Sequence, residues 1–252
     1  MLAANQTIIQ TAASVDAERQ PLFQLSRQLA HDFNNIWAHI FGLTQQAKET
    51  PGFQGRDDAL GRLSEVSSSG LFYSRNVMEA LAHTDGAPQI FDACTAVREW
   101  TAETEAALQD TVTFSCLVPP YPLHIRFPPN ALRLILLSLV GYALRTGDSK
   151  RWAMLGVRSV RGERRAKEEE ADAADIMFLC QLGETRSSMS QSFQQRVEAI
   201  RAVVVSYGGT AVTRIVPQVG VNVRIHLPLA PAPDDEADQG GKMGDVERSR
   251  SA

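Results

Sequence analysis

Three polar residues in one apolar-periodic segment have the types and spacing of a reactive site. His31 is followed directly by Asp32, and Asn35 lies one helical turn further on. An imidazole titrates near neutral pH and can act as a nucleophile. If the segment is a helix, His31 lies roughly 200° from Leu29 and from Phe33, so it faces solvent. Taken alone, a histidine in such a place is usually only a solvated surface side chain.

The helix that positions these residues is predicted from its apolar side chains, which recur at steps of three and four and therefore share one buried face. They are Leu22, Leu25, Leu29, Phe33, Ile36, Ile40, Leu43 and Ala47. Asn35 shares the face of His31, and Ala38 and Gly42 continue that face with side chains too small to obstruct a partner. We expect these residues, with Gln28, to form a docking surface around His31.

A second helix is expected to complete a helical hairpin. The first helix is predicted over about 13–48 and the second over about 57–82, separated by the breaker pair Pro51-Gly52. The inner face of the second helix is predicted to carry Leu60, Leu63, Val66, Gly70, Val77 and Leu81. Two such helices cannot bury both apolar stripes alone. The hairpin is therefore expected to form a four-helix bundle in a homodimer, with both copies of His31 outside.

Composition argues against several classes of function. The chain has 252 residues, a formal net charge of -4 and a pI near 5.8, so no nucleic acid and no anionic membrane is expected as a partner. No stretch approaches the ~20 apolar residues of a membrane span, and residues 1–20 lack the features of a signal peptide. We therefore expect a soluble, cytoplasmic protein.

No metal site is predicted. The three cysteines have no metal-ligand spacing and are expected to be buried thiols; they are Cys94, Cys116 and Cys180. The remaining histidines are scattered and form no metal-binding pattern with cysteines or acidic residues. They are His39, His83, His124 and His226.

The chain is predicted to have an N-terminal extension (1–12), the helical hairpin (13–84), a second domain (88–230) and a disordered tail (231–252). In the second domain helices are predicted over about 92–107, 128–145 and 194–207, and strands over about 112–118, 124–127, 152–160, 175–182, 211–215 and 219–227. The charged run 162–174 is interpreted as a solvated loop. Helices on one side of a mostly antiparallel sheet make the fold class α+β.

The string Leu-Ala-His-Asp-Phe-Asn-Asn at 29–35 resembles the H-box of sensor histidine kinases, especially the hybrid kinases, in which this histidine accepts a phosphoryl group. The resemblance implies that the hairpin is a dimerisation and phosphotransfer domain. It also implies roles for the neighbours of His31. Asp32 would accept a hydrogen bond from one ring nitrogen and leave the other as nucleophile, and Asn35 would hydrogen-bond a phosphoryl oxygen.

The segment 91–229 resembles the ATP-binding domain of the histidine kinases and the GHKL superfamily, an α/β sandwich. Its best local match is 132–143, where the family has the pattern L-x-x-x-L-x-N-L-x-x-N-A and the second Asn holds Mg²⁺ against the nucleotide. Ser138 and Tyr142 occupy the two Asn positions here. A phenol is a poor replacement for a carboxamide as a ligand of Mg²⁺.

Two further motifs of that family are also changed. Gln181-Leu182-Gly183-Glu184-Thr185 stands where the family has D-x-G-x-G, so that Gln181 replaces the Asp that binds adenine. Gln194-Gln195-Arg196-Val197 replaces the glycine-rich loop whose backbone approaches the phosphates. Only 186–193 remains for the nucleotide lid. The second domain is therefore expected to be a degenerate ATPase-like domain that binds no ATP.

Together these features predict a histidine phosphotransferase of a bacterial two-component phosphorelay. It would relay a phosphoryl group through His31 between aspartates of receiver domains in response regulators or a hybrid histidine kinase. No cofactor is expected on this chain, and Mg²⁺ is expected on the partner receiver domain. One alternative is a pseudokinase that only binds and dimerises, as a scaffold for a regulator or kinase. Another is an active autophosphorylating kinase, which would have to bind Mg-ATP despite Tyr142.

Overall fold

The computed structural model describes residues 2–50, 52–82, 87–108, 111–144, 151–160, 173–181, 191–216 and 219–232, and side chains from residue 21 onward except that of residue 151. Several expectations lie outside these residues: most of the charged run 162–174, most of the expected nucleotide lid, Gly183, and the tail from 233 onward.

Two long helices form the hairpin, α1 (Leu2–Glu49) and α2 (Phe53–Ala82). The second domain continues with β1 (Gln89–Asp92), α3 (Ala93–Leu108), β2 (Val112–Leu117), β3 (His124–Phe127), α4 (Pro129–Leu144), β4 (Arg151–Val160), β5 (Ala173–Cys180), α5 (Gln191–Ser206), β6 (Thr210–Val216) and β7 (Gly220–Pro228). This order confirms the predicted α+β class, with a hairpin followed by an α/β sandwich. None of the described helices is both long and apolar enough to cross a membrane.

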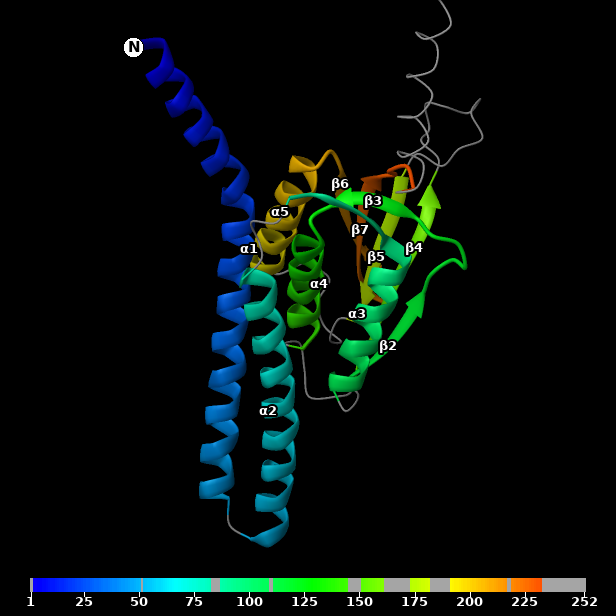
Figure 1. Ribbon diagram of the computed structural model, residues 1–252. Helices are drawn as coiled ribbons and strands as arrows, with labels where there is room; N and C mark the ends of the chain where they lie inside the picture. Colours follow the sequence, from blue (N-terminus) through cyan, green and yellow to red (C-terminus); the bar gives the residue numbers. More distant parts are fainter. Residues whose placement is uncertain are drawn as a thin grey trace, which may run out of the picture.

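The second domain places helices between its sheet and the hairpin. Its main sheet has the strand order β2-β4-β5-β7-β6, in which only β2 and β4 run parallel. The helices α3, α4 and α5 cover one face of this sheet, and α4 and α5 also contact the hairpin (Figure 1). Nearly every side chain of α4 from Ala131 to Ala143 is buried. This explains its strongly apolar sequence, because a helix packed on both sides has almost no polar face.

Four details differ from the sequence-based expectations. The first helix begins at Leu2 rather than at about residue 13, since no glycine or proline occurs before Pro21. Leu60 is exposed, because it lies about 80° around α2 from Gly70, and Ala59 is buried instead. Cys116 is exposed on the edge strand β2. The strand β1 was not predicted; it pairs with β3.

Asp92 joins β1 to α3 as the cap of that helix. Its Oδ1 accepts hydrogen bonds from the backbone N–H groups of Cys94 (3.0 Å) and Leu123 (2.9 Å), and its Oδ2 accepts from the backbone and hydroxyl of Thr95. Partial burial opposes the charged carboxylate, but these hydrogen bonds outweigh it and lower the pKa of Asp92. The thiol of Cys94 is affected in the other direction: burial and the nearby carboxylate raise its pKa to about 11.

We expect Asp92→Ala to lower the free energy of unfolding by about 1–2 kcal/mol at neutral pH, since the first turn of α3 loses its acceptor. A lowered native pKa means that this contribution is present above the unfolded pKa of about 3.9 and is lost as the pH falls through the native pKa. Urea unfolding of the wild type and the variant should therefore converge toward about pH 2. An equal difference at both pH values would contradict this role of the charge.

Candidate functional site

The side chains of α1 fall into three faces. At about 100° per residue, the buried residues Leu25, Leu29 and Leu43 lie roughly 120–160° around the helix from His31. The exposed apolar residues Phe23 and Phe41 lie about 80° from His31 in the opposite direction. The third face carries His31 itself.

The face of His31 is open to solvent, as predicted. His31, Ala38 and Gly42 are exposed, and Gln28 and Asn35 are partly exposed. A Cβ added to Gly42 would meet no atom within 4 Å. The five predicted residues therefore share one accessible strip of α1, which a partner surface could approach without displacing any other described element.

Asn35 orients the imidazole. Its Nδ2 lies 3.1 Å from Nδ1 of His31, one helical turn away. The two ends of an amide exchange by rotation of the side chain, so Asn35 can either donate a hydrogen bond to Nδ1 or accept one from Nδ1–H. In the second case Nε2 keeps its lone pair and becomes the nucleophilic nitrogen. Asn35 is thus a hydrogen-bond partner of the imidazole, a contact that had been expected of Asp32.

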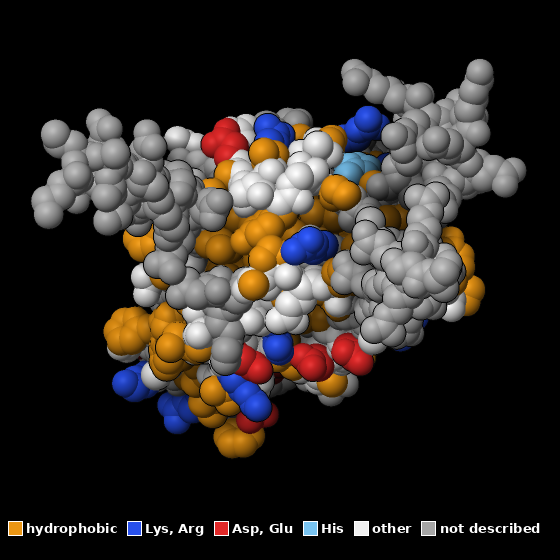
Figure 2. Space-filling view, turned by 45° about the horizontal axis from the view of Figure 1, so that its top comes forward, with side chains coloured by type: hydrophobic (Ala, Val, Ile, Leu, Met, Phe, Trp, Pro, Cys, Tyr) orange, Lys and Arg blue, Asp and Glu red, His pale blue; other side chains and the backbone are white. Residues whose placement is uncertain are grey.

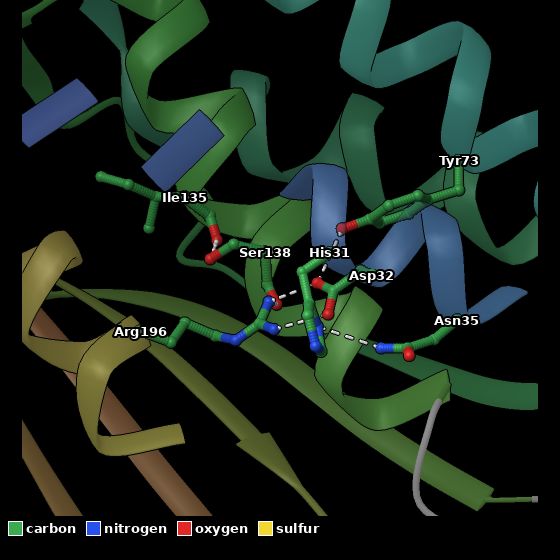
Figure 3. Close-up of polar contacts among 7 residues, drawn as sticks. All are labelled: His31, Asp32, Asn35, Tyr73, Ile135, Ser138 and Arg196. Atoms are coloured by element: carbon green, nitrogen blue, oxygen red, sulfur yellow. Dashed lines mark hydrogen bonds and ion pairs between the residues drawn. The ribbon is translucent and has the colours of Figure 1, made fainter. Parts of the chain in front are cut away.

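Asp32 is fully buried, and its carboxylate lies among Tyr73 of the hairpin and Arg196 of the second domain (Figure 3). Both its oxygens are held by the guanidinium of Arg196: Oδ2 lies 2.7 Å from Nη1 and Oδ1 lies 2.8 Å from Nη2. The hydroxyl of Tyr73 donates to Oδ2 at 3.0 Å. Because Asp32 lies about 100° around α1 from His31, the carboxylate serves the buried face. This is a different role from the one that the H-box resemblance implies.

Four elements meet at Asp32. Tyr73 comes from α2, Arg196 from α5, and Arg196 also donates to the backbone carbonyl of Ser138 in α4. Gly141 allows the close approach of α4, because a Cβ there would lie 2.5 Å from the Tyr73 hydroxyl oxygen and 2.9 Å from Oδ2 of Asp32. We call these five residues (Asp32, Tyr73, Ser138, Gly141 and Arg196) the interdomain junction.

The charges of the junction balance. Asp32 and Arg196 are both fully buried. Burial disfavours the charged guanidinium, but the hydrogen bonds and the charge of Asp32 outweigh it, so the pKa of Arg196 is raised. Burial and the negative charge of Asp32 raise the pKa of Tyr73 well above its usual value near 10. Tyr73 is therefore a neutral donor, and one carboxylate faces one guanidinium.

The residues aligned with the magnesium and phosphate positions of an ATPase form a packed core. Tyr142 is buried, and its ring centroid lies 4.2 Å from that of Phe193. The guanidinium carbon of Arg196 lies 5.9 Å from the Tyr142 ring centroid, within the range of a cation–π contact. The hydroxyl of Ser138 donates to the carbonyl of Ile135 in its own helix. These side chains supply no carboxamide for Mg²⁺, so the position does not fit a magnesium nucleotide.

The other residues of the expected nucleotide site are less informative. Gln181 is exposed at the end of β5, where its backbone N–H donates to the carbonyl of Trp152. Gly183 lies outside the described residues. Within the described part of the chain, no group of three or more His, Cys, Asp or Glu side chains is arranged to hold a metal ion.

Sequence reasoning missed Arg196 and Tyr73 as partners of Asp32. Spacing could have indicated that both are buried: Arg196 lies three residues after Phe193 and four before Ile200, and Tyr73 lies between Gly70 and Val77. Spacing could not have paired them, because the two partners of the ion pair are 164 residues apart.

No family model matches the chain, and no curated protein matches it. The similar solved structures include histidine kinase domains. One is the mycobacterial sensor histidine kinase MprB, with 13% identity and a TM-score of 0.42 over 58% of this chain and 100% of that one. The catalytic domain of histidine kinase ThkA has 12% identity and a TM-score of 0.44 over 57% and 96%. The histidine kinase AdeS of Acinetobacter baumannii has 13% identity and a TM-score of 0.41 over 80% and 98%.

Proposed function

We propose that this chain is a histidine phosphotransferase of two-component signalling, which relays a phosphoryl group through His31 between aspartates of receiver domains without using ATP. The observation that carries the proposal is that the adjacent residues His31 and Asp32 have opposite surroundings. His31 lies exposed on a strip of α1 bordered by small side chains, while its neighbour Asp32 is committed to a buried ion pair with the second domain. His31 is therefore accessible to a partner, and Asp32 joins the hairpin to the second domain.

The transfer needs little from this chain beyond position. Nε2 of His31 attacks the phosphorus of an aspartyl phosphate; the N–P bond forms as the bond from phosphorus to the carboxylate oxygen breaks, and the aspartate leaves as a carboxylate. The side-chain oxygen of Asn35 accepts a hydrogen bond from Nδ1–H, which stays protonated, and keeps the ring in line. The reverse step returns the group to another aspartate. Phosphoryl transfer depends mainly on positioning and charge stabilisation, and the receiver would bring its own Mg²⁺.

The packing of Tyr142 supports transfer without ATP. In the histidine kinase ATP-binding domains that this domain resembles, the corresponding position binds phosphates and Mg²⁺. Here it is filled by three buried side chains, those of Tyr142, Phe193 and Arg196. Opening that position for a nucleotide would separate the aromatic pair and remove Arg196 from Asp32.

A homodimer would cover an apolar stripe on the hairpin. Phe23, Trp37 and Phe41 are exposed on one side of α1, and Leu71 and Met78 are exposed on α2. Figure 2 shows hydrophobic side chains gathered at the lower left, where the hairpin lies. The stripe on α1 is separate from the strip of His31, so a four-helix bundle built from two copies would leave both histidines accessible.

The test is transfer from a phosphorylated receiver domain, in parallel with Mg-ATP, to the wild type and to His31→Ala. We expect label on the wild type from the receiver only, and none on the variant. Label from ATP would show that the chain is a kinase. No transfer from a panel of receivers, with receiver binding retained in His31→Ala, would favour the scaffold function.

Replacing Gly42 with Phe should weaken receiver docking. The side chain fits the free chain, because Gly42 is exposed with open space around it, but it would obstruct a surface that approaches His31. We expect the receiver concentration for half-maximal transfer to rise about tenfold, equivalent to about 1.4 kcal/mol. Sedimentation should give an unchanged dimer.

The matched control is Gly61→Phe, at an exposed glycine of α2 that also has no atom within 4 Å of an added Cβ. If Gly42→Phe left the transfer rate unchanged, receivers would have to dock elsewhere.

A further inference from the structure

Arg196 links the helix that carries His31 to the second domain. The Arg196 guanidinium bonds both oxygens of Asp32, the residue that follows His31. It also bonds the Ser138 carbonyl, so a single side chain of α5 ties α1 to α4. None of the described hydrogen bonds of Arg196 involves His31 or Asn35.

The junction leaves the second domain little freedom to move. The guanidinium and the carboxylate form a planar pair with two hydrogen bonds, which defines an orientation as well as a distance. Both partners are fully buried. A small shift of the domain would separate the two charges while both stay buried, and a buried charge without its partner is strongly unfavourable. Gly141 adds a steric constraint, because α4 approaches Tyr73 and Asp32 as closely as a glycine permits.

We propose that the Asp32–Arg196 pair is a positioning device for phosphoryl transfer, which holds the second domain at one fixed place beside His31 so that a receiver meets a preformed surface. The inference rests on the proposed function and deepens it. Because the domain is already held in place, docking does not have to order it, and the phosphoryl group meets His31 in line. Arg196 acts through Asp32 and is not itself catalytic.

The test uses two variants that distinguish an effect on the position of the second domain from an effect on the stability of the fold. Asp32→Leu with Arg196→Met removes both charges and keeps apolar volume, so the chain should remain folded. Arg196→Lys keeps the charge but loses the planar fork. With a phosphorylated receiver in single-turnover transfer, we expect the saturating rate of the double variant to fall on the order of 10–100-fold. Arg196→Lys should retain part of that rate.

Two results would overturn the inference. One is a folded double variant that transfers at the wild-type rate with wild-type saturation, which would make the pair only a stabilising contact. The other is loss of transfer in Asp32→Asn with full activity in Arg196→Lys, which would make Asp32 act directly on His31.

A second readout does not depend on phosphate. Hydrogen exchange of α1 and α5 should show the two helices opening together in the wild type and separately in the double variant; joint opening in both would contradict the coupling. If the wild type accepts no phosphate from any receiver but the helices are coupled as expected, the proposed function fails while the coupling stands.

Discussion

Arg196→Met is expected to lower the free energy of unfolding by about 3–5 kcal/mol, because it leaves the carboxylate of Asp32 buried without its partner. Arg196 supplies two of the hydrogen bonds that Asp32 accepts, and Tyr73 supplies a third. Tyr73 still donates its hydroxyl hydrogen bond, but a phenol carries no positive charge, so it cannot replace the guanidinium. Urea denaturation of the purified variant measures the change.

The double variant Asp32→Leu with Arg196→Met should recover most of that loss. Replacing a buried ion pair by apolar side chains of similar volume is often close to neutral, whereas removing one partner is not. The two substitutions should therefore be strongly non-additive. Arg201→Met on the same helix is the control, because Arg201 is exposed and makes a hydrogen bond to the carbonyl of Ala211 at 3.3 Å. A double variant that is less stable than Arg196→Met would contradict this description.

Gly141→Ala is expected to destabilise the chain by about 1–3 kcal/mol through crowding. The new methyl group would lie 2.5 Å from the hydroxyl oxygen of Tyr73 and 2.8 Å from its ring carbon Cζ. Tyr73 would have to move and so lose its hydrogen bond to Asp32. In an uncrowded helix the same change stabilises, by roughly 0.5–1 kcal/mol.

Gly61→Ala provides that comparison, since an added Cβ at Gly61 meets no atom within 4 Å. Thermal or urea unfolding should thus give opposite signs for the two variants. Combining Gly141→Ala with Tyr73→Phe removes the hydroxyl that is crowded most, and it should cost less than the sum of the single changes. A stabilising Gly141→Ala would show that α4 does not pack against the hairpin at this distance.

The apolar spacing along the chain determined its local structure. Steps of three and four predicted the two hairpin helices and the exposure of His31, because a helix of 3.6 residues per turn assigns each residue to a face without tertiary information. The alternating strands and the strongly apolar segment of α4 likewise predicted the α+β class. The start of α1 was predicted about eleven residues too late, although no glycine or proline interrupts residues 2–20.

Tertiary packing decided which side chains meet. The sequence placed Asp32 beside His31, and chain neighbours suggested that they act together. Helix geometry alone sets Asp32 about 100° from His31. The fold then places Arg196, 164 residues away along the chain, against that side of α1. Tyr142 and Arg196 occupy positions that the family resemblance assigns to nucleotide binding, and in this chain they contact each other and Phe193. Periodicity can show that such residues are buried, but only the packing of α1, α4 and α5 shows what they are buried against.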